Sequence, residues 1–506
     1  MASNGTNRGP CPGAAGVTQY PCNNSNFFPI AVWFAGVQQP SDSQSDQAAG
    51  LNTYVSIDAN SNLAAVAPGM YVIAQQDEWG PGTPSSQTSQ WSHINGWQTS
   101  DELDMTEGPP GAGTKGYTDQ QNIIKSLPQN DGRLIFASYG KGVAFWESDA
   151  NAAQWLNYGQ AFTDDAYWFS DTDVCLASQG GNLFNGGSAD LTPGQCHRAS
   201  NYGALIDRVH YLETLDGNQA KPVWSVIEDG DPGTSGSTGN VTPTQVTAAT
   251  WDSIVHGAQG IEYFNHSFAG PCISDNNLRD PCYASMRATI TANNNEIQSL
   301  APELNSPTVT PGATVVATTG GVPVHTMLKN VNGTDYLFAI SEGDGSGSPT
   351  TATLSIPGAG NSAASVYNEN RSVLVSNGQI TDNFGPYQVH IYQIGAASPP
   401  PPPPPTALSV TQNPLSTGTA GSAYLTSLGA SGGTSPYTWT TTGLPAGLTL
   451  SGNTISGTPT TPGTTNLTLT VTDSSTPPNT ASATLPLTVN AAPPGPAPPP
   501  GADFSV

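Results

Sequence analysis

Eight short apolar runs recur between residues 27 and 306, and the segments between them are long enough to form helices. The runs are residues 28–34, 53–57, 71–74, 94–97, 134–137, 166–170, 223–227 and 260–264. Buried strands that alternate with helices over about 240 residues are typical of a (β/α)8 TIM barrel. A doubly wound open sheet is the main alternative, but no glycine-rich phosphate-binding sequence follows the first run.

A second, β-rich block covers residues 307–395. Its strand-like segments are 314–319, 324–328, 336–340, 351–356 and 388–392, and no long helical stretch interrupts them. Short strands with frequent turns indicate a compact sandwich. Because no spacer separates this block from the barrel, we expect the sandwich to pack against it.

Proline marks the next boundary, since residues 396–406 contain seven consecutive prolines. Such a run adopts an extended polyproline conformation and serves as a semi-rigid spacer. Residues 407–490 then alternate Thr or Ser with apolar residues between Gly/Pro turns, which predicts an antiparallel sandwich. Residues 491–506 form a second proline-rich linker that ends like the first strand of another module, so we expect a longer parent protein.

The segments Ser435–Trp439, Gly443–Leu450 and Ile455–Pro459 carry a more specific signal. Together they resemble the immunoglobulin-like repeat found in bacterial surface and secreted enzymes. The resemblance implies that residues 407–490 form a separate all-β immunoglobulin-like domain.

The charge balance excludes several classes of partner. The chain has 12 Lys and Arg against 37 Asp and Glu, which gives a formal charge of -25. Nucleic-acid binding needs cationic surface, and an anionic membrane would repel this protein. No apolar run of about 18 residues is present to span a bilayer. We therefore expect a soluble monomer with no nucleic-acid or membrane partner.

The six cysteines fall into three local pairs and show no metal-binding spacing. The pairs are Cys11 with Cys22, Cys175 with Cys196, and Cys272 with Cys282. An even count at short separations favours disulfides and an oxidising compartment, although six cysteines allow fifteen connectivities. Residues 1–26 are predicted to be an N-terminal extension without a signal peptide. The composition favours a secreted or extracellular bacterial protein.

Carboxylates follow two of the eight runs at the position where barrel enzymes place their active site. The fourth run is followed by Asp101, Glu102 and Asp104, and the seventh ends in Glu228 and Asp229. Glycoside cleavage needs one protonated carboxyl group and one ionised one in the same cleft. The sequence therefore predicts a pair of catalytic carboxylates contributed by strands four and seven.

This placement resembles clan A of the glycoside hydrolases, a superfamily of retaining (β/α)8 enzymes. The resemblance covers nearly all of residues 27–300 and includes the segments Phe28–Trp33, Ala49–Tyr54, Gly69–Ile73 and Trp251–Ile261. It implies that Glu102 is the general acid/base and Glu228 the nucleophile. Clan members commonly carry Asn immediately before the acid/base, whereas this chain has Asp101.

That departure leaves alternatives open at both carboxylates. Asp101 and Asp104 can share the role of Glu102, or the acidic cluster can cap the following helix. Asp229 and Asp231 compete with Glu228, and the oxygen-rich loop that they begin can be a calcium loop, although it lacks the full twelve-residue spacing. We expect no metal and no cofactor.

Several residues near strand ends are candidates for sugar contacts. Aromatic rings stack on the C–H faces of sugars, which favours Trp33, Trp97 and the loop residue Trp79. Asn265 and His266, at the end of the eighth run, are placed to meet hydroxyl groups, and Asp101 is also predicted to contact substrate. Glu262, two residues inside the eighth run, is predicted to be a paired structural acid.

These features together predict a secreted retaining glycoside hydrolase that acts within a polysaccharide. Its partner would be the polysaccharide or oligosaccharide substrate, cleaved by double displacement through two glutamates. The alternative is a non-catalytic carbohydrate-binding or cell-surface adhesion protein built on the same barrel. The sequence specifies neither the sugar nor the linkage.

Overall fold

The structure is a computed structural model of the 506-residue chain. It describes residues 20–80, 88–99, 101–106, 114–127, 132–181, 183, 189–215, 221–233, 241–270, 272–319, 322–342, 348–395, 408–411, 415–433, 437–474 and 478–492. The chain divides into two compact units, residues 1–396 and 397–506. Each unit is described by itself.

Eight parallel strands close into a barrel in the first unit, in the order of the sequence. They are β1 Ile30–Trp33, β2 Thr53–Val55, β3 Tyr71–Gln75, β4 Gly96–Gln98, β5 Leu134–Tyr139, β6 Ala161–Asp164, β7 Val223–Glu228 and β8 Gly260–Phe264. The (β/α)8 prediction is confirmed, and a doubly wound sheet is excluded because β8 pairs with β1.

The sixth strand was predicted in the wrong place. The apolar run 166–170 is not a strand, and β6 lies earlier, at Ala161–Asp164. Residues 168–170 are buried in the loop after β6, where Trp168 has no exposed surface. Apolar residues buried in a loop give the same sequence pattern as a buried strand, so periodicity alone could not separate them.

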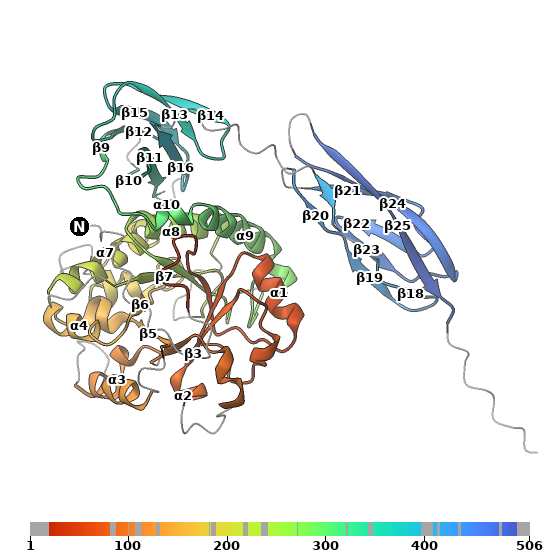
Figure 1. Ribbon diagram of the computed structural model, residues 1–506, viewed down its shortest axis with the longest axis horizontal. Helices are drawn as coiled ribbons and strands as arrows, with labels where there is room; N and C mark the ends of the chain where they lie inside the picture. The colour runs from red at the N-terminus through yellow and green to blue at the C-terminus, as the bar shows by residue number, and fades with distance from the viewer. Residues whose placement is uncertain are drawn as a thin grey trace, which may run out of the picture. The chain divides into compact units, whose positions relative to one another are not determined.

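Helices surround the barrel on its outer side (Figure 1). They are α1 Pro40–Ala48, α2 Gln76–Trp79, α3 Thr114–Ser126, α4 Asp149–Trp155, α6 Pro193–Cys196, α7 Ser200–Leu215, α8 Pro243–Val255, α9 Ala284–Ser299 and α10 Ala301–Leu304. The start of α8 shows how local sequence fixes the first residue of a helix. Thr242 caps the helix, Pro243 occupies its first position, and the Gln245 side chain accepts a hydrogen bond from the backbone of Thr242 in return.

The barrel interior changes character along its axis. At the N-terminal end of the strands it is apolar, with Phe136 and Trp224 in contact at a ring-centroid distance of 4.7 Å. One layer further along, Ser138 and Thr163 share a 3.0 Å hydrogen bond between their hydroxyl groups. Beyond that layer lie the acidic residues at the C-terminal ends of the strands. The polar chemistry is therefore concentrated at one end of the barrel.

A β-sandwich of two antiparallel sheets follows the barrel within the same unit. Its strands are β9 Thr314–Thr319, β10 Val324–Val331, β11 Thr334–Ser341, β12 Thr350–Ser355, β13 Ser362–Val366, β14 Arg371–Val375, β15 Gln379–Phe384 and β16 Val389–Ile394. The sheet orders are β10-β11-β16-β13-β14 and β15-β12-β9. Phe338 of β11 stacks on Trp251 of α8, so the sandwich packs on the barrel as predicted.

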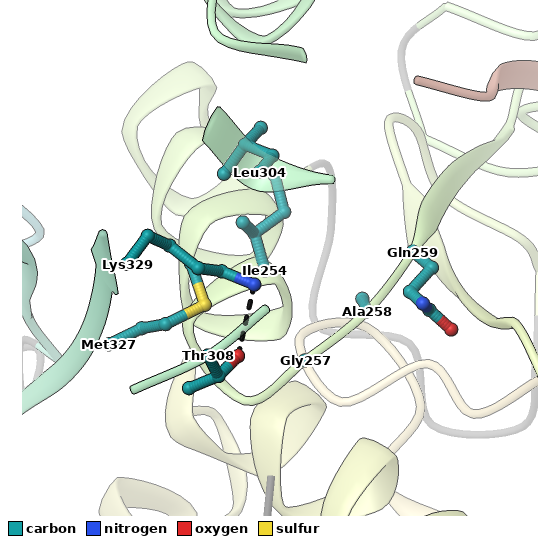
Figure 2. A pocket seen from close by; sticks show the side chains of 8 residues that line it. All are labelled: Ile254, Gly257, Ala258, Gln259, Leu304, Thr308, Met327 and Lys329. Atoms are coloured by element: carbon teal, nitrogen blue, oxygen red, sulfur yellow. Dashed lines mark hydrogen bonds between the residues drawn. The ribbon is translucent and has the colours of Figure 1, made fainter. Parts of the chain in front are cut away.

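A small hollow lies where the sandwich meets the barrel (Figure 2). Gly257, Ala258 and Gln259, which precede β8, line one side, while Met327 and Lys329 of β10 line the other. On the side of β10, the Lys329 ammonium donates to the Thr308 hydroxyl at 3.0 Å (Figure 2). This hollow is at the N-terminal end of β8, so it is separate from the acidic end of the barrel.

The second unit consists of β-strands in its described part. They are β17 Ser409–Val410, β18 Gly418–Thr419, β19 Tyr424–Ser427, β20 Ala430–Ser431, β21 Thr438–Thr442, β22 Leu448–Ser451, β23 Thr454–Gly457, β24 Gly463–Thr472 and β25 Thr480–Asn490. Its two larger sheets have the orders β18-β25-β24-β21 and β19-β23-β22. Leu467, Leu469 and Leu487 form the centre of its core.

Disulfides join Cys175 to Cys196 and Cys272 to Cys282, in agreement with the predicted local pairing. Cys22 is also disulfide-bonded, whereas Cys11 lies outside the described residues. Among the described helices, none is both long enough and apolar enough to cross a membrane.

Candidate active site

The loop after β4 brings three carboxyl groups to the C-terminal end of the barrel. Asp104 is buried and accepts hydrogen bonds from the backbone N–H groups of Gly140 and Val143, at 3.1 and 2.7 Å. These bonds tie the loop to the end of β5, so Asp104 has a structural role. Asp101 and Glu102 are half-buried and remain available to solvent.

Glu102 is held in an unusual backbone conformation. Its φ is 44°, in the left-handed region, and its N–H donates to the Ser138 carbonyl at 3.2 Å. A Cβ atom at position 140 would collide with Oε1 of Glu102, so the glycine there makes room for this carboxyl group. Backbone strain of this kind concentrates at functional sites.

Glu228 ends β7 and is completely buried. Its Oε1 accepts hydrogen bonds from the Phe169 N–H at 2.7 Å and the Tyr202 hydroxyl at 2.8 Å, and its Oε2 accepts one from the Ser170 hydroxyl at 3.1 Å. Phe169 and Ser170 belong to the loop that was mistaken for strand six. This loop thus covers and orients the Glu228 carboxyl group.

Asp165 is a site residue that the sequence analysis missed. It directly follows β6, is half-buried, and accepts a 2.6 Å hydrogen bond from the Tyr167 hydroxyl. Its charge acts on Glu102, and the charges of Asp101, Glu262 and Glu228 act on it. Asp165 was overlooked because strand six was placed five residues too late; the correct strand end would have drawn attention to it.

The electrostatics of this end of the barrel favour protonated carboxyl groups. Burial, followed by the charges of Asp165 and Asp101, raises the pKa of Glu102 to about 9. Burial raises the pKa of Glu228 to about 8, although its hydrogen bonds from Tyr202, Phe169 and Ser170 act in the opposite direction. The pKa of Asp101 rises to about 6, again mainly through burial.

Glu262 points into the barrel, since it pairs in register with Ala31, whose side chain belongs to the interior cluster. It is 1% exposed, and burial together with the charge of Asp101 raises its pKa well above the ordinary value. No hydrogen bond to its Oε2 occurs within the part of the chain that the structure describes. The strongest charge acting on Glu262 is that of another carboxylate, Asp101, and its role as a paired structural acid stays a prediction.

An aromatic cluster stands beside these carboxylates. Trp33 of β1 stacks on Phe264 of β8 at a ring-centroid distance of 5.1 Å and meets His266 edge-on at 5.4 Å. His266 stacks in turn on Phe268 at 5.6 Å. Trp33 is half-buried and Phe268 is 51% exposed. Phe268, which the sequence analysis did not select, thus offers the most accessible ring of the cluster.

Two tryptophans predicted to contact substrate belong to the core instead. Trp79 has no exposed surface, and its indole N–H donates to the Ile57 carbonyl at 2.9 Å. Trp97 is also fully buried, with Trp91 packed edge-on and Arg133 lying over its ring. It faces away from the barrel interior, because its neighbour Gly96 faces inward against Ile73 and Leu134.

The loop after β8 uses its polar residues to hold itself in place. The Asn265 side chain accepts the Leu278 N–H at 2.9 Å and is 1% exposed, so it holds the loop in place and offers little surface for the predicted substrate contact. Asp229 accepts from the Asn277 amide at 2.6 Å, and Asp231 accepts the Gly233 N–H at 3.0 Å. Among the described residues, Glu228, Asp229 and Asp231 are not part of a group of side chains that could hold a metal ion, and residues 234–240 of the calcium-loop hypothesis lie outside the described part.

Comparison with known proteins identifies one region of the chain. Residues 404–490 match the family described as "Putative Ig domain", which confirms the predicted immunoglobulin-like module. No curated protein matches the chain.

Solved structures of similar topology include carbohydrate-active proteins at very low identity. The α-amylase of Geobacillus thermoleovorans is 10% identical, with 74% of this chain and 99% of that chain covered and a TM-score of 0.44. A glycoside hydrolase family 5 protein from Bacteroides vulgatus is 12% identical, with coverages of 73% and 89% and a TM-score of 0.43. None of these likenesses identifies an activity for this chain.

Proposed function

We propose that the first unit is a retaining glycoside hydrolase in which Glu102 is the general acid/base. The observation that carries this proposal is the electrostatic interaction between two half-buried acidic residues, Glu102 and Asp165, at the C-terminal end of the barrel. Glu102 combines solvent access with a pKa raised to about 9. A carboxyl group that keeps its proton at neutral pH can protonate a leaving glycosidic oxygen.

Glu228 is the first candidate for the nucleophile. It ends the strand predicted for this role, and three hydrogen-bond donors hold its oxygens and stabilise the ionised form. In the proposed reaction its carboxylate attacks the anomeric carbon while Glu102 gives its proton to the departing oxygen. Glu102 then removes a proton from the water that cleaves the glycosyl-enzyme ester, which restores both groups.

The hydrogen bonds of the two glutamates support these roles. Burial raises the pKa of both, but of the two only Glu228 is held by hydrogen-bond donors that act in the opposite direction. These donors favour the ionised form that a nucleophile needs.

Asp165 is a second candidate for the nucleophile, and a specific observation favours it. Glu228 has no exposed surface beneath Phe169 and Ser170, whereas Asp165 is half-buried and in charge contact with Glu102. If Glu228 is the nucleophile, the loop after β6 must open to admit the sugar. If Asp165 is, Glu228 anchors that loop.

Trp33 and Phe268 are proposed to form the sugar-binding platform, with His266 packed between them and Asp101 placed to meet a hydroxyl group. Endo action, secretion and membership of clan A remain parts of this proposal. They draw support from the disulfides, the immunoglobulin-like module and the position of the carboxylates.

The test is reducing-sugar release from a panel of plant, fungal and bacterial polysaccharides. We expect the wild type to cleave one polymer, and Glu102→Gln to lose at least about 100-fold in kcat/KM, the usual size of a general-acid contribution. Aryl glycosides, whose leaving group needs no proton, should lose less. Binding of a polymer without cleavage would instead establish the alternative, a non-catalytic carbohydrate-binding protein.

A mechanism-based fluorosugar of the cleaved type then identifies the nucleophile. We expect a covalent adduct on Glu228, located by peptide mass spectrometry, and none in Glu228→Gln. An adduct on Asp165 would transfer the role to that residue. Hydrolysis of the polymer with inversion of configuration would contradict the double-displacement mechanism.

A further inference from the structure

A second cluster of ionisable side chains lies on the outer side of the barrel, where α8 meets the sandwich. Asp252 and His256 are four residues apart on α8, so they share one face of the helix. His325 comes from β10 of the sandwich and reaches the same point. Its Nδ1 lies 2.7 Å from Nε2 of His256 and 2.9 Å from Oδ1 of Asp252.

The outer nitrogen of each histidine already faces a carboxylate. Nδ1 of His256 lies 2.8 Å from Asp207, and Nε2 of His325 lies 2.6 Å from Glu342. A carboxylate accepts hydrogen bonds and donates none when ionised, so these contacts place an N–H on the outer nitrogen of each ring. Although burial opposes it, the carboxylates of Asp252 and Glu342 raise the pKa of His325 to about 10, so without a metal a proton occupies the space between the inner nitrogens.

Three electron-pair donors therefore converge on one point. They are Nε2 of His256, Nδ1 of His325 and the Asp252 carboxylate. Asp252 is completely buried, and its Oδ2 accepts no hydrogen bond from the described residues, although it lies 3.9 Å from Nε2 of His256. Facing lone pairs repel each other, so either a proton or a metal cation must lie between the two inner nitrogens.

We propose that this cluster is a zinc site that joins the barrel to the sandwich, with Asp252, His256 and His325 as ligands. Zinc takes nitrogen and oxygen ligands at about 2.0–2.1 Å in a tetrahedron, so ligand atoms lie about 3.3 Å apart. The two inner nitrogens are 2.7 Å apart and would move apart when zinc binds. Asp252 lies 2.9 Å from Nδ1 of His325 through Oδ1 and 3.9 Å from Nε2 of His256 through Oδ2.

The surroundings have the features of a metal-binding shell. Ligating histidines usually donate their other N–H to a carboxylate, as His256 and His325 do to Asp207 and Glu342. Three carboxylates and two neutral histidines carry a charge of -3, which a divalent ion partly neutralises. The histidine side chains are 18% and 27% exposed, so water can reach a fourth coordination position.

The side chains of Asp252 and His256 are closely packed against α7. A Cβ atom at position 203 of α7 would collide with Oδ2 of Asp252 and with the His256 ring, so a glycine is needed there. Because the ligands come from α8 and β10, zinc would fix the sandwich on the barrel. This inference does not depend on the proposed glycosidase activity.

The test is a calorimetric titration of zinc into the full chain after removal of metals with a chelator. We expect one tightly bound zinc per chain that His256→Gln and His325→Gln each weaken by more than about 100-fold. Asp207→Asn, which changes a supporting carboxylate, should weaken it by about 10-fold. His93→Gln, at an exposed histidine remote from α8 in sequence, is the matched control and should bind zinc as the wild type does.

Circular dichroism establishes that each variant is folded. If His325→Gln does not fold, His256→Gln at the end of α8 carries the comparison, and cobalt(II) absorption of the wild type reports the tetrahedral nitrogen and oxygen ligands directly. No zinc uptake by the wild type, or equal affinity in His256→Gln, would overturn the proposal. A proton shared between the histidines would then explain the cluster.

Discussion

The acidic end of the barrel and the junction between α8 and the sandwich both gather carboxylates, but they give them different partners. At the barrel end, Glu228 and Asp165 accept hydrogen bonds from tyrosine, serine and backbone donors. At the junction, Asp252 and Glu342 face histidines. The partners of a carboxyl group therefore decide its role. Beside neutral donors it can hold a proton, whereas beside imidazoles it is a candidate metal ligand.

The largest expected effect is a loss of stability on substitution of a core residue at the junction between α8 and the sandwich. Trp251→Ala removes a ring that is 1% exposed and stacked on Phe338 of the sandwich. We expect it to lower the free energy of unfolding by about 3–5 kcal/mol, since the cavity cannot refill. Denaturant unfolding measures the loss.

The matched change at the barrel end is Trp33→Ala. Because Trp33 is half-buried, its removal should lower stability less and weaken substrate binding instead. If Trp33→Ala and Trp251→Ala lost the same free energy of unfolding, Trp33 would be a structural residue like Trp251.

A change of charge at the barrel end comes next in size. Asp165→Asn removes the strongest of the charges that raise the pKa of Glu102, so that pKa should fall from about 9. We expect the alkaline limb of the pH–activity profile to move to lower pH by about one unit. The activity at the optimum should fall by about 10- to 100-fold if Asp165 only assists. An unmoved limb would show that Glu102 is not the titrating acid.

The pH dependence of stability tests the raised pKa values of the carboxyl groups at the barrel end. The pKa values of Glu228 and Asp229 are both raised to about 8, above the ordinary range of about 4 in the unfolded chain. Between these limits the folded state binds more protons than the unfolded state, so stability falls as pH rises from about 4.5 to 8.

We therefore expect the thermal midpoint of the first unit to be several degrees lower at pH 8 than at pH 5. Glu228→Gln cannot ionise and should have a shallower slope. Calorimetric scans across this range measure both proteins, and a midpoint that rises with pH would contradict the assignment.

The smallest expected effect concerns the exposed ring of the aromatic cluster. Phe268→Ala should raise KM about fivefold, the order expected for one aromatic stacking contact, with little change in stability because the side chain is 51% exposed. Initial-rate kinetics on the cleaved polymer test this. An unchanged KM would remove Phe268 from the proposed platform.

Much of the barrel could be predicted from local pattern, and its exceptions have a physical cause. Seven of the eight apolar runs overlap observed strands, because burial on both faces leaves a continuous apolar signature. Residues 166–170 carry the same signature as a buried loop, which displaced strand six and concealed Asp165. The error in one element therefore caused the omission at the site.

Side-chain partners were less predictable than strands. Trp79 and Trp97 were selected for their position near strand ends, but both rings turn into the core. The spacing of Asp252 and His256 was readable, yet His325 lies 69 residues from His256 and belongs to another layer. A sequence without this long-range contact predicts no metal site.

The local sequence was enough to predict the order of the domains, the barrel, the place of Glu102 after β4 and that of Glu228 at the end of β7. These follow from periodicity and turn chemistry, which act over a few residues. Long-range packing was needed to show that the charge of Asp165 acts on Glu102, that Phe268 is exposed, and that two layers bring His256 and His325 together. Hydrophobic burial is encoded locally, whereas the partner of a buried polar group depends on which segments pack against each other.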